Sequence, residues 1–268
     1  MKYQRIKPCE KLAGIVGWYW QAESEDATSQ VQKIIPDGYP EMVFHFGDPF
    51  RIRLGNHWQQ QGQALLGGQI QHHFHLQNTG VANIFGISFH PTALSRLFGL
   101  DMQQITNRVV DIEEVLPKLQ LVRGIMSAGS TQARIAAAET SLLSILSGAT
   151  ADHPIDRALQ IMRDRKGLIS MEELSESIQL GSRQMQRLFQ KYVGVTPKFY
   201  ARVIRFNTLF DLVKEEGTTW LDMVHASGYY DQSHFIRNFK AFTGEDPTTY
   251  SFASPSLTNF FAFKSSVA

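Results

Sequence analysis

Cysteine is almost absent from this chain of 268 residues, since Cys9 is the only one. A single thiol excludes an internal disulfide and any zinc site built from several cysteines. Long apolar runs are absent too, because no stretch approaches the roughly 18 residues that a membrane-spanning helix requires. The N-terminal sequence MKYQRIKPCEKL lacks the apolar segment of a signal peptide. These absences predict a cytoplasmic protein with no membrane partner.

Motifs that carry catalysis are also missing. The chain has no nucleophile motif and no glycine-rich phosphate loop, and Cys9 has no evident histidine partner. We therefore expect no enzymatic activity and no cofactor. The composition itself is ordinary: 43% apolar and 19% charged residues are typical of a soluble globular protein, and the length leaves room for two domains.

The first part of the chain, to about residue 110, has the pattern of short strands and turns. Its apolar runs are separated by turn residues, and they include WYWQAE, QKIIPDG, EMVFHFG and NIFGISF. From Pro91 the pattern lengthens toward helices, in PTALSRLFGL, IEEVLPKLQLVRGIM and TQARIAAAETSLLSIL. We predict a β-rich, sandwich- or barrel-like domain with helices over residues 1–150, with a boundary in the small polar residues at 148–154.

The last of these helical segments carries an apolar stripe, formed by Ile135, Leu142, Leu143 and Leu146. Such a stripe either packs inside its own domain or serves as a dimer interface. We favour packing, because burial within the domain is the commonest fate of an amphipathic helix.

Residues 151–253 have helical patterns throughout, and the clearest is LGSRQMQRLFQKYVG at 180–194. Counted from Ser182, its apolar residues follow at i, i+3, i+4 and i+7, namely Met185, Leu188, Phe189 and Tyr192. The other face holds only Arg, Gln and Lys besides the opening serine. Arg and Gln have the bidentate geometry that suits guanine and adenine edges in a major groove. This pattern indicates a DNA recognition helix.

The same pattern recurs 50 residues later. That offset pairs Met185 with Phe235, Arg187 with Arg237, Phe189 with Phe239, Gly194 with Gly244, Pro197 with Pro247 and Tyr200 with Tyr250. A short helix with a capping signal precedes each copy, at Ser170 with Glu173 and at Thr219 with Asp222. The repeat therefore predicts two helix-turn-helix units.

A single helix is predicted to join the two units, from Pro197 to Glu216, with Thr196 as its N-cap and Gly217 at its end. It would span about 30 Å at ~1.5 Å per residue. One turn of DNA is roughly 34 Å, so the two recognition helices could enter successive major-groove segments.

Charge is distributed unevenly in this half. Residues 152–253 hold 13 Lys and Arg against 13 Asp and Glu, so the half is neutral overall. The stretch from Ser182 to Arg205 nevertheless has six basic residues and no acid. The positive field is local, and we expect modest non-specific DNA affinity.

The second unit, GYYDQSHFIRNFKAFTGEDPTTY, resembles the signature of the AraC/XylS family of bacterial transcription regulators, and the first unit with its linking helix fits the same domain. The sequence departs from the family at Ser175 and Val224, where Ala is usual, and at Ser251, where Arg often stands. The strings IIPDGYPEMVFHFGDP and FGISFHPTALSRLFG resemble a sensor-like domain found ahead of such DNA-binding domains.

The resemblance implies an α+β protein that regulates transcription. Residues 1–150 would sense a small-molecule signal, residues 151–253 would form an all-α DNA-binding domain of two helix-turn-helix units joined by a long helix, and residues 254–268 would be a tail whose FFAF segment could pack back. The implied partners are double-stranded promoter DNA, an effector, a second copy of the chain, and RNA polymerase if the protein is an activator.

The resemblance also implies roles for individual residues. The base-reading set would be Arg183, Gln186, Arg187, Gln232, Ser233 and Arg237, and the phosphate-contacting set Lys198, Arg205 and Lys240. Base contact and a solvated surface are equally compatible with Gln184, His234 and Asn238.

Four residues of the first domain are candidates for binding a ligand. Trp18, Trp20 and Tyr39 could line an apolar pocket or belong to the core, and Glu41 on the following strand could face the pocket. Asp37 is most simply a turn residue of the PDG sequence.

Histidines cluster at His72, His73 and His75, and the last two would share one face of a strand, as in a cupin-type metal site. The Glu and Gly spacing of the cupin motif is missing, so we predict no metal. Two alternatives stay open: a cupin-like metal-dependent enzyme with accessory DNA binding, and a ligand-independent dimeric DNA-binding protein.

Overall fold

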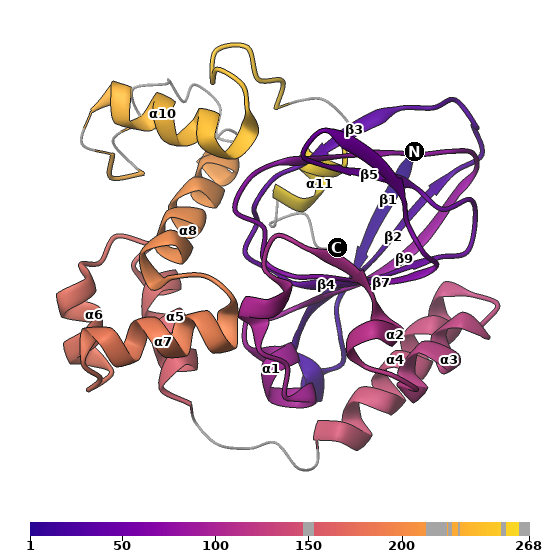
Figure 1. The fold of residues 1–268 in the computed structure, drawn as a ribbon, viewed down its shortest axis with the longest axis horizontal. Helices are drawn as coiled ribbons and strands as arrows, with labels where there is room; N and C mark the ends of the chain where they lie inside the picture. Colours follow the sequence, from indigo (N-terminus) through magenta and orange to yellow (C-terminus); the bar gives the residue numbers. More distant parts are fainter. Residues whose placement is uncertain (147–152, 213–223, 225–226, 230, 253–255, 263–268) are drawn as a thin grey trace.

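The computed structural model of the chain describes residues 1–146, 153–212, 224, 227–229, 231–252 and 256–262. A β-rich N-terminal part and a helical C-terminal part lie side by side (Figure 1), which confirms the predicted α+β class. The predicted boundary between residues 150 and 151 falls outside the described residues. No helix in the described ranges is both long and apolar enough to cross a membrane.

The larger sheet has six antiparallel strands in the order β1-β2-β9-β4-β7-β10. In that order the strands are Lys2–Ile6, Val16–Ser24, Ala82–Phe89, Glu41–His45, Ala64–Gly67 and Val109–Asp111. Side chains alternate between the two faces of each strand. In β4, for example, Met42 and Phe44 point to a helical layer, whereas Glu41, Val43 and His45 point to the second sheet.

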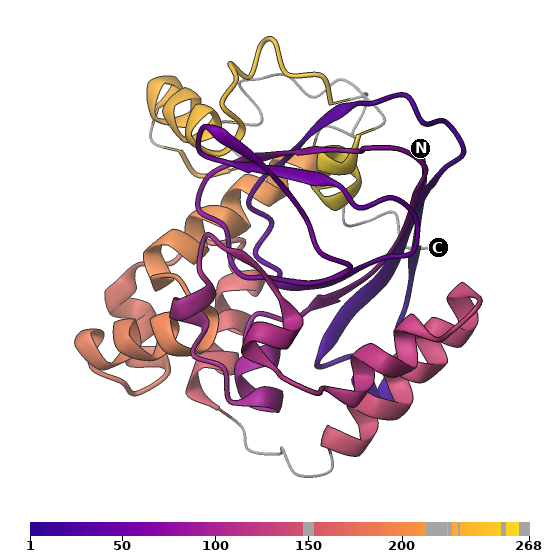
Figure 2. The ribbon, with the colours of Figure 1, turned by 45° about the vertical axis from the view of Figure 1, so that its right-hand side comes forward.

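The smaller sheet has four antiparallel strands in the order β3-β8-β5-β6 and covers the second face of the larger one. In that order its strands are Val31–Ile34, Phe74–Gln77, Arg51–Leu54 and His57–Gln60. The terminal helix α11, Leu257–Ala262, packs against β3, and Figures 1 and 2 both show it beside this sheet. The described part of the FFAF segment, which belongs to α11, therefore packs back onto the β-rich part.

The helical layer on the first face contains α1 (Ala93–Phe98), α2 (Ile112–Val115), α3 (Gln120–Met126) and α4 (Thr131–Leu146), with two short 3-10 turns at Glu10–Leu12 and Met102–Ile105. The helical run expected at 112–126 is divided in two, because Pro117 interrupts it and Lys118 has a φ of 60°. The apolar stripe of α4 packs against the domain core, with Leu142 fully buried, which confirms the packing alternative.

The C-terminal part contains α5 (Pro154–Asp164), α6 (Met171–Ser177), α7 (Ser182–Val193), α8 (Pro197–Leu212) and α10 (Gln232–Thr243). The described part of α8 has 16 residues, or about 24 Å at ~1.5 Å per residue. Its predicted N-cap is confirmed, because the Thr196 hydroxyl accepts from Phe199 N at 3.2 Å. The predicted end at Gly217 lies outside the described residues.

Several contacts join the two parts. Asp156 of α5 accepts hydrogen bonds from Thr92 and Arg96, both at 2.5 Å. Thr106 Oγ1 donates to the carbonyl of Gly194 at the end of α7, at 2.6 Å. Lys33 of β3 forms an ion pair with Glu245 beyond α10. The N-terminal part therefore touches both helix-turn-helix units.

Candidate DNA interface and ligand cavity

The first helix-turn-helix unit consists of α6, a turn at 178–181 and α7. The Ser170 hydroxyl caps α6 by accepting from Glu173 N at 3.0 Å, as predicted. Ser175 is buried, and its hydroxyl donates to the Leu180 carbonyl, so this departure from the usual Ala closes the turn. Gly194 ends α7 with a φ of 94°, a left-handed conformation that favours glycine.

The exposed face of α7 carries the predicted base-reading side chains. Met185, Phe189 and Val193 are buried against the core of the unit, whereas Arg183, Gln186 and Arg187 are exposed. Within the described part of the chain, neither arginine has a carboxylate partner. Their guanidinium groups are therefore available to a ligand outside the protein.

The second unit presents α10 in the same way. Asp231 caps the helix by accepting from His234 N at 2.7 Å, and Gly244 ends it with a φ of 73°. Phe235 and Phe239 are buried. The three side chains of α10 that were predicted to contact bases are exposed, namely Gln232, Ser233 and Arg237. The start of the short helix predicted ahead of α10, with Thr219 and Asp222, lies outside the described residues, and of the segment LDMVHAS only Val224 and Ser227 are described, both buried.

Asn238 differs from its neighbours on α10. It is buried, its Oδ1 accepts from Arg202 Nε at 2.8 Å, and its Nδ2 donates to the His234 carbonyl at 2.9 Å. Both ends of the amide are used within the protein, so its role here is structural.

The three predicted phosphate contacts have different surroundings. Lys198 is exposed on the first turn of α8. Lys240 forms an ion pair with Asp246 at 2.9 Å, and this contact, with Thr248, lowers the pKa of Asp246 to about 2. Arg205 is only partly exposed, and its guanidinium carbon lies 5.9 Å from the ring centre of Tyr229. Lys198 is thus the freest of the three.

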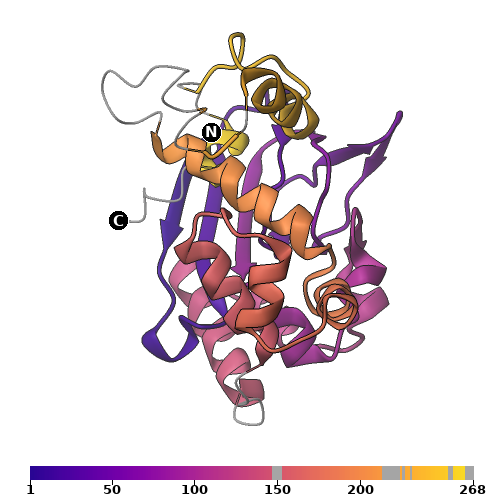
Figure 3. The same cartoon turned by 90° about the vertical axis from the view of Figure 1, so that its left-hand side faces the viewer.

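The two recognition helices lie toward opposite ends of α8 (Figure 1). Both run across the view in Figure 1, and Figure 3 shows them one above the other. This arrangement suits two helices that enter successive segments of one groove.

Removal of either helix cap should lower the free energy of unfolding by a similar amount. We expect Ser170→Ala and Asp231→Ala each to lower the free energy of unfolding by about 1 kcal/mol, since each leaves a helix N-terminal amide without its acceptor. Urea unfolding followed by circular dichroism measures the change, and Ser233→Ala, on the exposed face of α10, is the control. Equal stability of Asp231→Ala and the control would contradict the capping role.

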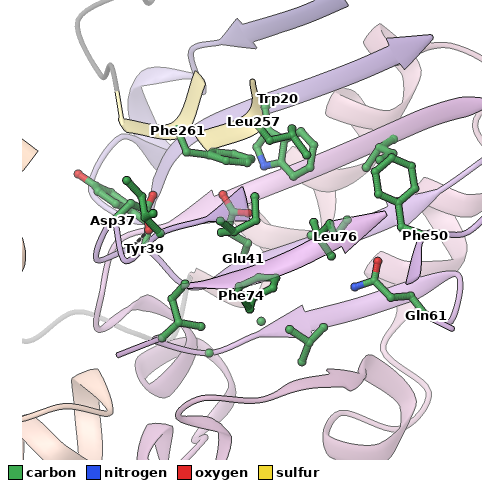
Figure 4. Close-up of a pocket in the computed structure, with 18 of the residues that line it drawn as sticks. Trp20, Asp37, Tyr39, Glu41, Phe50, Gln61, Phe74, Leu76, Leu257 and Phe261 are labelled. Carbon is green, nitrogen blue, oxygen red and sulfur yellow. Dashed lines mark hydrogen bonds between the residues drawn. The ribbon is translucent and has the colours of Figure 1, made fainter. Parts of the chain in front are cut away.

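A cavity of about 90 Å³ lies between the two sheets of the N-terminal part (Figure 4). The larger sheet contributes Trp20, Glu41, Val43, His45, Gly67, Ile84 and Val109. The smaller sheet contributes Ile34, Phe74 and Leu76, connecting segments contribute Ile35, Asp37, Tyr39, Phe50, Gln61, Gly68 and Ile70, and α11 contributes Leu257 and Phe261. The wall is mainly apolar with a few polar groups, which is typical of small-molecule sites.

A glycine makes room for the largest side chain of the wall. Trp20 of β2 is paired with Gly86 of β9, and a Cβ at Gly86 would lie 2.0 Å from the indole ring. The ring therefore lies across the neighbouring strand, and its edge borders the cavity beside the Glu41 carboxylate (Figure 4).

Glu41 is the buried carboxyl group of the cavity. Burial raises its pKa to about 8, and the nearby negative charge of Asp37 adds to the effect. The Ser88 hydroxyl donates to Glu41 Oε1, and the Arg5 guanidinium favours the ionised form, but both effects are smaller than that of burial. At neutral pH the group is therefore largely protonated.

His45, four residues along the same strand, is kept neutral. Its side chain is almost fully buried, and burial lowers its pKa to about 4, with Gln61 offsetting only part of the effect. Within the described part of the chain Gln61 is its polar neighbour, although neither ring nitrogen reaches close hydrogen-bond geometry. A buried imidazole with so weak a partner can also form a hydrogen bond with a group in the cavity.

Of the four predicted ligand-binding residues, Trp20, Tyr39 and Glu41 line the cavity. Trp18 does not: it lies behind Tyr39, with ring centres 4.6 Å apart, and beneath the Arg5 guanidinium at 4.8 Å. Asp37, expected only as a turn residue, also lines the cavity. No periodicity in the sequence marked it, because Asp37 lies in the segment between β3 and β4.

Two histidines of the predicted cluster lie close together but contact different groups. His73 and His75 have ring centres 5.6 Å apart, but His75 Nδ1 is 3.1 Å from Arg53 and His73 packs where a Cβ on Gly244 would fall. Across the described residues, no three His, Cys, Asp or Glu side chains gather as metal ligands would. Nothing in this geometry favours the cupin-like alternative.

The cavity and the C-terminal part share one loop. Ile35 and Asp37 line the cavity, yet Ile35 also belongs to the apolar core around Phe206 of α8. The Asp37 carbonyl accepts from Asn207 Nδ2 at 2.8 Å, and Gly38, with a φ of 88°, packs against Tyr200. Movement of this loop would reach α8 directly.

Helix α11 makes a second connection. Its backbone at Leu257 donates to Gln32 of β3 at 2.8 Å, and Asn259 binds the carbonyls of Ser251 and Phe252 at 3.0 and 2.8 Å. Phe252 packs on the core of the second helix-turn-helix unit. The apolar FFAF segment indicated from the sequence that the tail could pack back, but the sequence did not show where it would pack.

Two family models match the chain. Residues 4–111 match a domain of unknown function, DUF6597, and residues 174–251 match a helix-turn-helix domain. Together these matches span the β-rich part and most of the two helix-turn-helix units.

Curated relatives match over 79 residues of the chain. The chain is 27% identical over 79 residues to the HTH-type transcriptional regulator GbdR of Pseudomonas aeruginosa, which is 30% of this chain and 22% of that protein. It is 28% identical over 79 residues to the uncharacterized HTH-type transcriptional regulator YidL of Escherichia coli, or 27% of that protein. The matches thus span about a quarter of each relative.

Among solved structures, ToxT from Vibrio cholerae aligns with 92% of this chain and 98% of its own, at 10% identity and a TM-score of 0.47. The AraC-like transcriptional activator CuxR aligns with 83% of this chain and 90% of its own, at 11% identity and a TM-score of 0.28. Likenesses at this level support no inference about the site.

Proposed function

Because this chain belongs, through residues 174–251, to the AraC-type helix-turn-helix transcriptional regulators, we propose that it binds promoter DNA with α7 and α10 under the control of a small molecule. The observation that carries the proposal is the pair of exposed Arg and Gln faces on two capped helices. The effector would bind in the cavity between the sheets. The protein would act in the cytoplasm, where its DNA is, and would have no catalytic role.

The base contacts are proposed for the side chains that are exposed and have no side-chain partner among the residues that the structure describes. On α7 these are Arg183, Gln186 and Arg187, and on α10 they are Gln232, Ser233 and Arg237. Lys198 would contact phosphate, since it is exposed at the first turn of α8. Lys240 and Arg205 would contribute less to phosphate binding. Lys240 is already paired with Asp246, and the guanidinium of Arg205 lies against the ring of Tyr229.

Control by an effector is supported by the two connections from the cavity. The loop at 35–39 and helix α11 each touch both the cavity and the core of the second unit. A molecule that changes the position of either one changes the relation between α10 and the N-terminal part. By linkage, an effector that alters DNA affinity must have its own affinity altered by DNA to the same extent. Pairing into a homodimer and contact with RNA polymerase stay predictions.

In vitro selection of random duplex DNA tests the proposal. We expect the wild-type protein to enrich two short motifs about one helical turn apart. Arg187→Ala and Arg237→Ala should each cost about 1 to 3 kcal/mol on the preferred sequence and blur one motif each, because a bidentate arginine–guanine contact is lost.

Lys198→Ala is the matched control. It should weaken all sequences alike and lower the salt dependence of binding by about one phosphate contact. If the arginine variants merely scaled every sequence equally, the base-contact assignment would be wrong. If neither the wild type nor any variant enriched a motif in the presence or absence of a metabolite panel, the DNA-binding proposal would fail.

A further inference from the structure

We infer that Arg202 of α8 and Asn238 of α10 form a joint that fixes the direction of the second recognition helix, and thereby the spacing between the two DNA motifs that the protein selects. Spacing has a meaning only if α7 and α10 both read DNA, so the inference rests on the proposed function. Both residues are positioning residues, which act on DNA through the placement of α10 and contact no base themselves.

Helix α8 joins the two helix-turn-helix units, and its side chains belong to the cores of both (Figure 1). Tyr200 and Ala201, near its start, are buried in the core of the first unit. Val203 and Phe206 are buried in the core of the second. Arg202 therefore lies where the first core ends and the second begins. A contact from this point to α10 sets the second recognition helix relative to the first.

The half-buried side chain of Arg202 touches both helices. Its Nε donates to Asn238 Oδ1 at 2.8 Å. Its guanidinium carbon lies 5.2 Å from the ring centre of Phe242 on α10 and 5.8 Å from that of Phe199 on α8, with Tyr229 as a further neighbour. Within the described ranges Arg202 has no carboxylate partner. Asn238 is thus the polar group that holds this guanidinium.

Asn238 is tied to its own helix as well as to α8. The side chain is 6% exposed, and its Nδ2 donates to the His234 carbonyl one turn earlier in α10, at 2.9 Å. A rotation or shift of α10 would break the bond to Arg202 and leave a buried carbonyl oxygen unpaired, which costs more than the bond itself contributes. Apolar contacts lack this directional requirement, so the polar pair selects one arrangement of the two helices.

The first unit has an apolar residue at the equivalent position. The offset of 50 residues that relates the two units pairs Asn238 with Leu188, which packs against the first core. A leucine thus meets the packing needs of this position in one unit, whereas the other unit has a buried amide. Buried polar pairs contribute little net stability compared with apolar residues of similar size, and their best-attested use is to specify one register.

The joint lies next to the proposed base contacts, because Asn238 directly follows Arg237 in the chain. One added base pair moves the second motif by about 3.4 Å along the DNA and turns it by about 35° around the axis. A recognition helix that is fixed on α8 cannot follow both movements. The wild type should therefore accept one spacing of the two motifs.

Binding to duplexes that carry the two selected motifs at the preferred distance, one base pair closer or one base pair farther apart tests the inference. The proteins are the full-length wild type, Asn238→Leu, the double variant Arg202→Met with Asn238→Leu, and Asn238→Asp, which keeps the acceptor. Arg205→Met is the control, because it removes a neighbouring cation of α8 that makes no hydrogen bond to Asn238. The double variant leaves neither partner unpaired and should fold, which urea unfolding followed by circular dichroism checks.

We expect the wild type and Asn238→Asp to prefer one spacing roughly tenfold or more over its neighbours, because any other spacing breaks the joint. Asn238→Leu, which keeps every charge, and the double variant should bind all three duplexes within roughly threefold of one another. Arg205→Met should keep the wild-type preference.

Two results would overturn the inference. One is a wild-type spacing preference in both Asn238→Leu and the double variant. The other is a preference that persists in the double variant while its affinity for all three duplexes falls by the same factor, as for Arg205→Met, which would make Arg202 a phosphate contact.

Failure here is separable from failure of the proposed function. If the wild type selects no motif, the proposed function fails and the joint has no role in DNA reading. If the wild type selects two motifs whose spacing stays equally fixed in the variants, the DNA reading stands and the assignment of the joint is wrong.

Discussion

The Glu41→Gln variant is expected to be more stable than the wild type at neutral pH, by about 3 kcal/mol at pH 7. Burial, with the charge of Asp37, raises the pKa of Glu41 from 4.5 to about 8 in the folded protein. A group with a raised folded pKa contributes stability that is complete below the unfolded pKa and is lost as the pH rises through the folded one. The wild type should therefore lose stability between about pH 4.5 and pH 8. Gln has the shape of the protonated acid and cannot ionise.

Urea unfolding at several pH values measures this difference. The exposed Glu25, changed to Gln, is the control and should follow the wild-type curve. His45, whose pKa is lowered to about 4, destabilises the protein as the pH falls through its unfolded value of 6.5, but it does so in both proteins and cancels in the comparison. Parallel curves for wild type and Glu41→Gln would mean that the carboxyl group is hydrated in the folded state.

Features with a local cause were predictable from sequence. The apolar spacing of Met185 and Phe189 fixes which face of α7 is buried, and the hydroxyl of Ser170 caps α6 whatever surrounds it. Gly194 and Gly244 each follow a helix because they accept the left-handed conformation that ends it. These effects act within a few residues, so a pattern in the sequence is sufficient.

Features with a distant cause were not predictable. Ile35 belongs to the core of the second helix-turn-helix unit, although more than 150 residues separate it from Val203 and Phe206. Helix α11 closes a cavity built from strands at the other end of the chain. Arg205 and Asn238 look like surface residues by spacing, yet they are partly or wholly covered by neighbours from other elements. Burial of this kind depends on tertiary packing, which periodicity does not encode.

The distant contacts are also those through which the cavity would act on DNA binding. The core around Phe206 contains residues from the N-terminal loop, from α8 and from α10. It is therefore both the support of the second recognition helix and the place where the sensor part contacts it. Loosening this core should affect α10 more than α7, which has a core of its own around Phe189.

Phe206→Ala is expected to lower the free energy of unfolding by about 3 to 5 kcal/mol, through the lost burial of the ring and the cavity left behind. The ring is fully buried, with centres 4.9 Å from Phe242, 5.5 Å from Phe210 and 5.6 Å from Phe239. Urea unfolding gives the magnitude, and hydrogen exchange shows where protection is lost. Amides of α10 should lose protection before those of α7, because the core of the first unit does not contain Phe206.

Two controls separate this effect from a general loss of structure. Phe206→Leu keeps most of the volume and should cost less than about 1.5 kcal/mol, and Thr208→Ala, on the same helix but only partly buried, should cost less still. In the DNA selection, Phe206→Ala should lose the motif read by α10 and keep the one read by α7. Simultaneous loss of both motifs, with equal loss of protection in α7 and α10, would mean that the two units unfold as one body and that the cavity controls both.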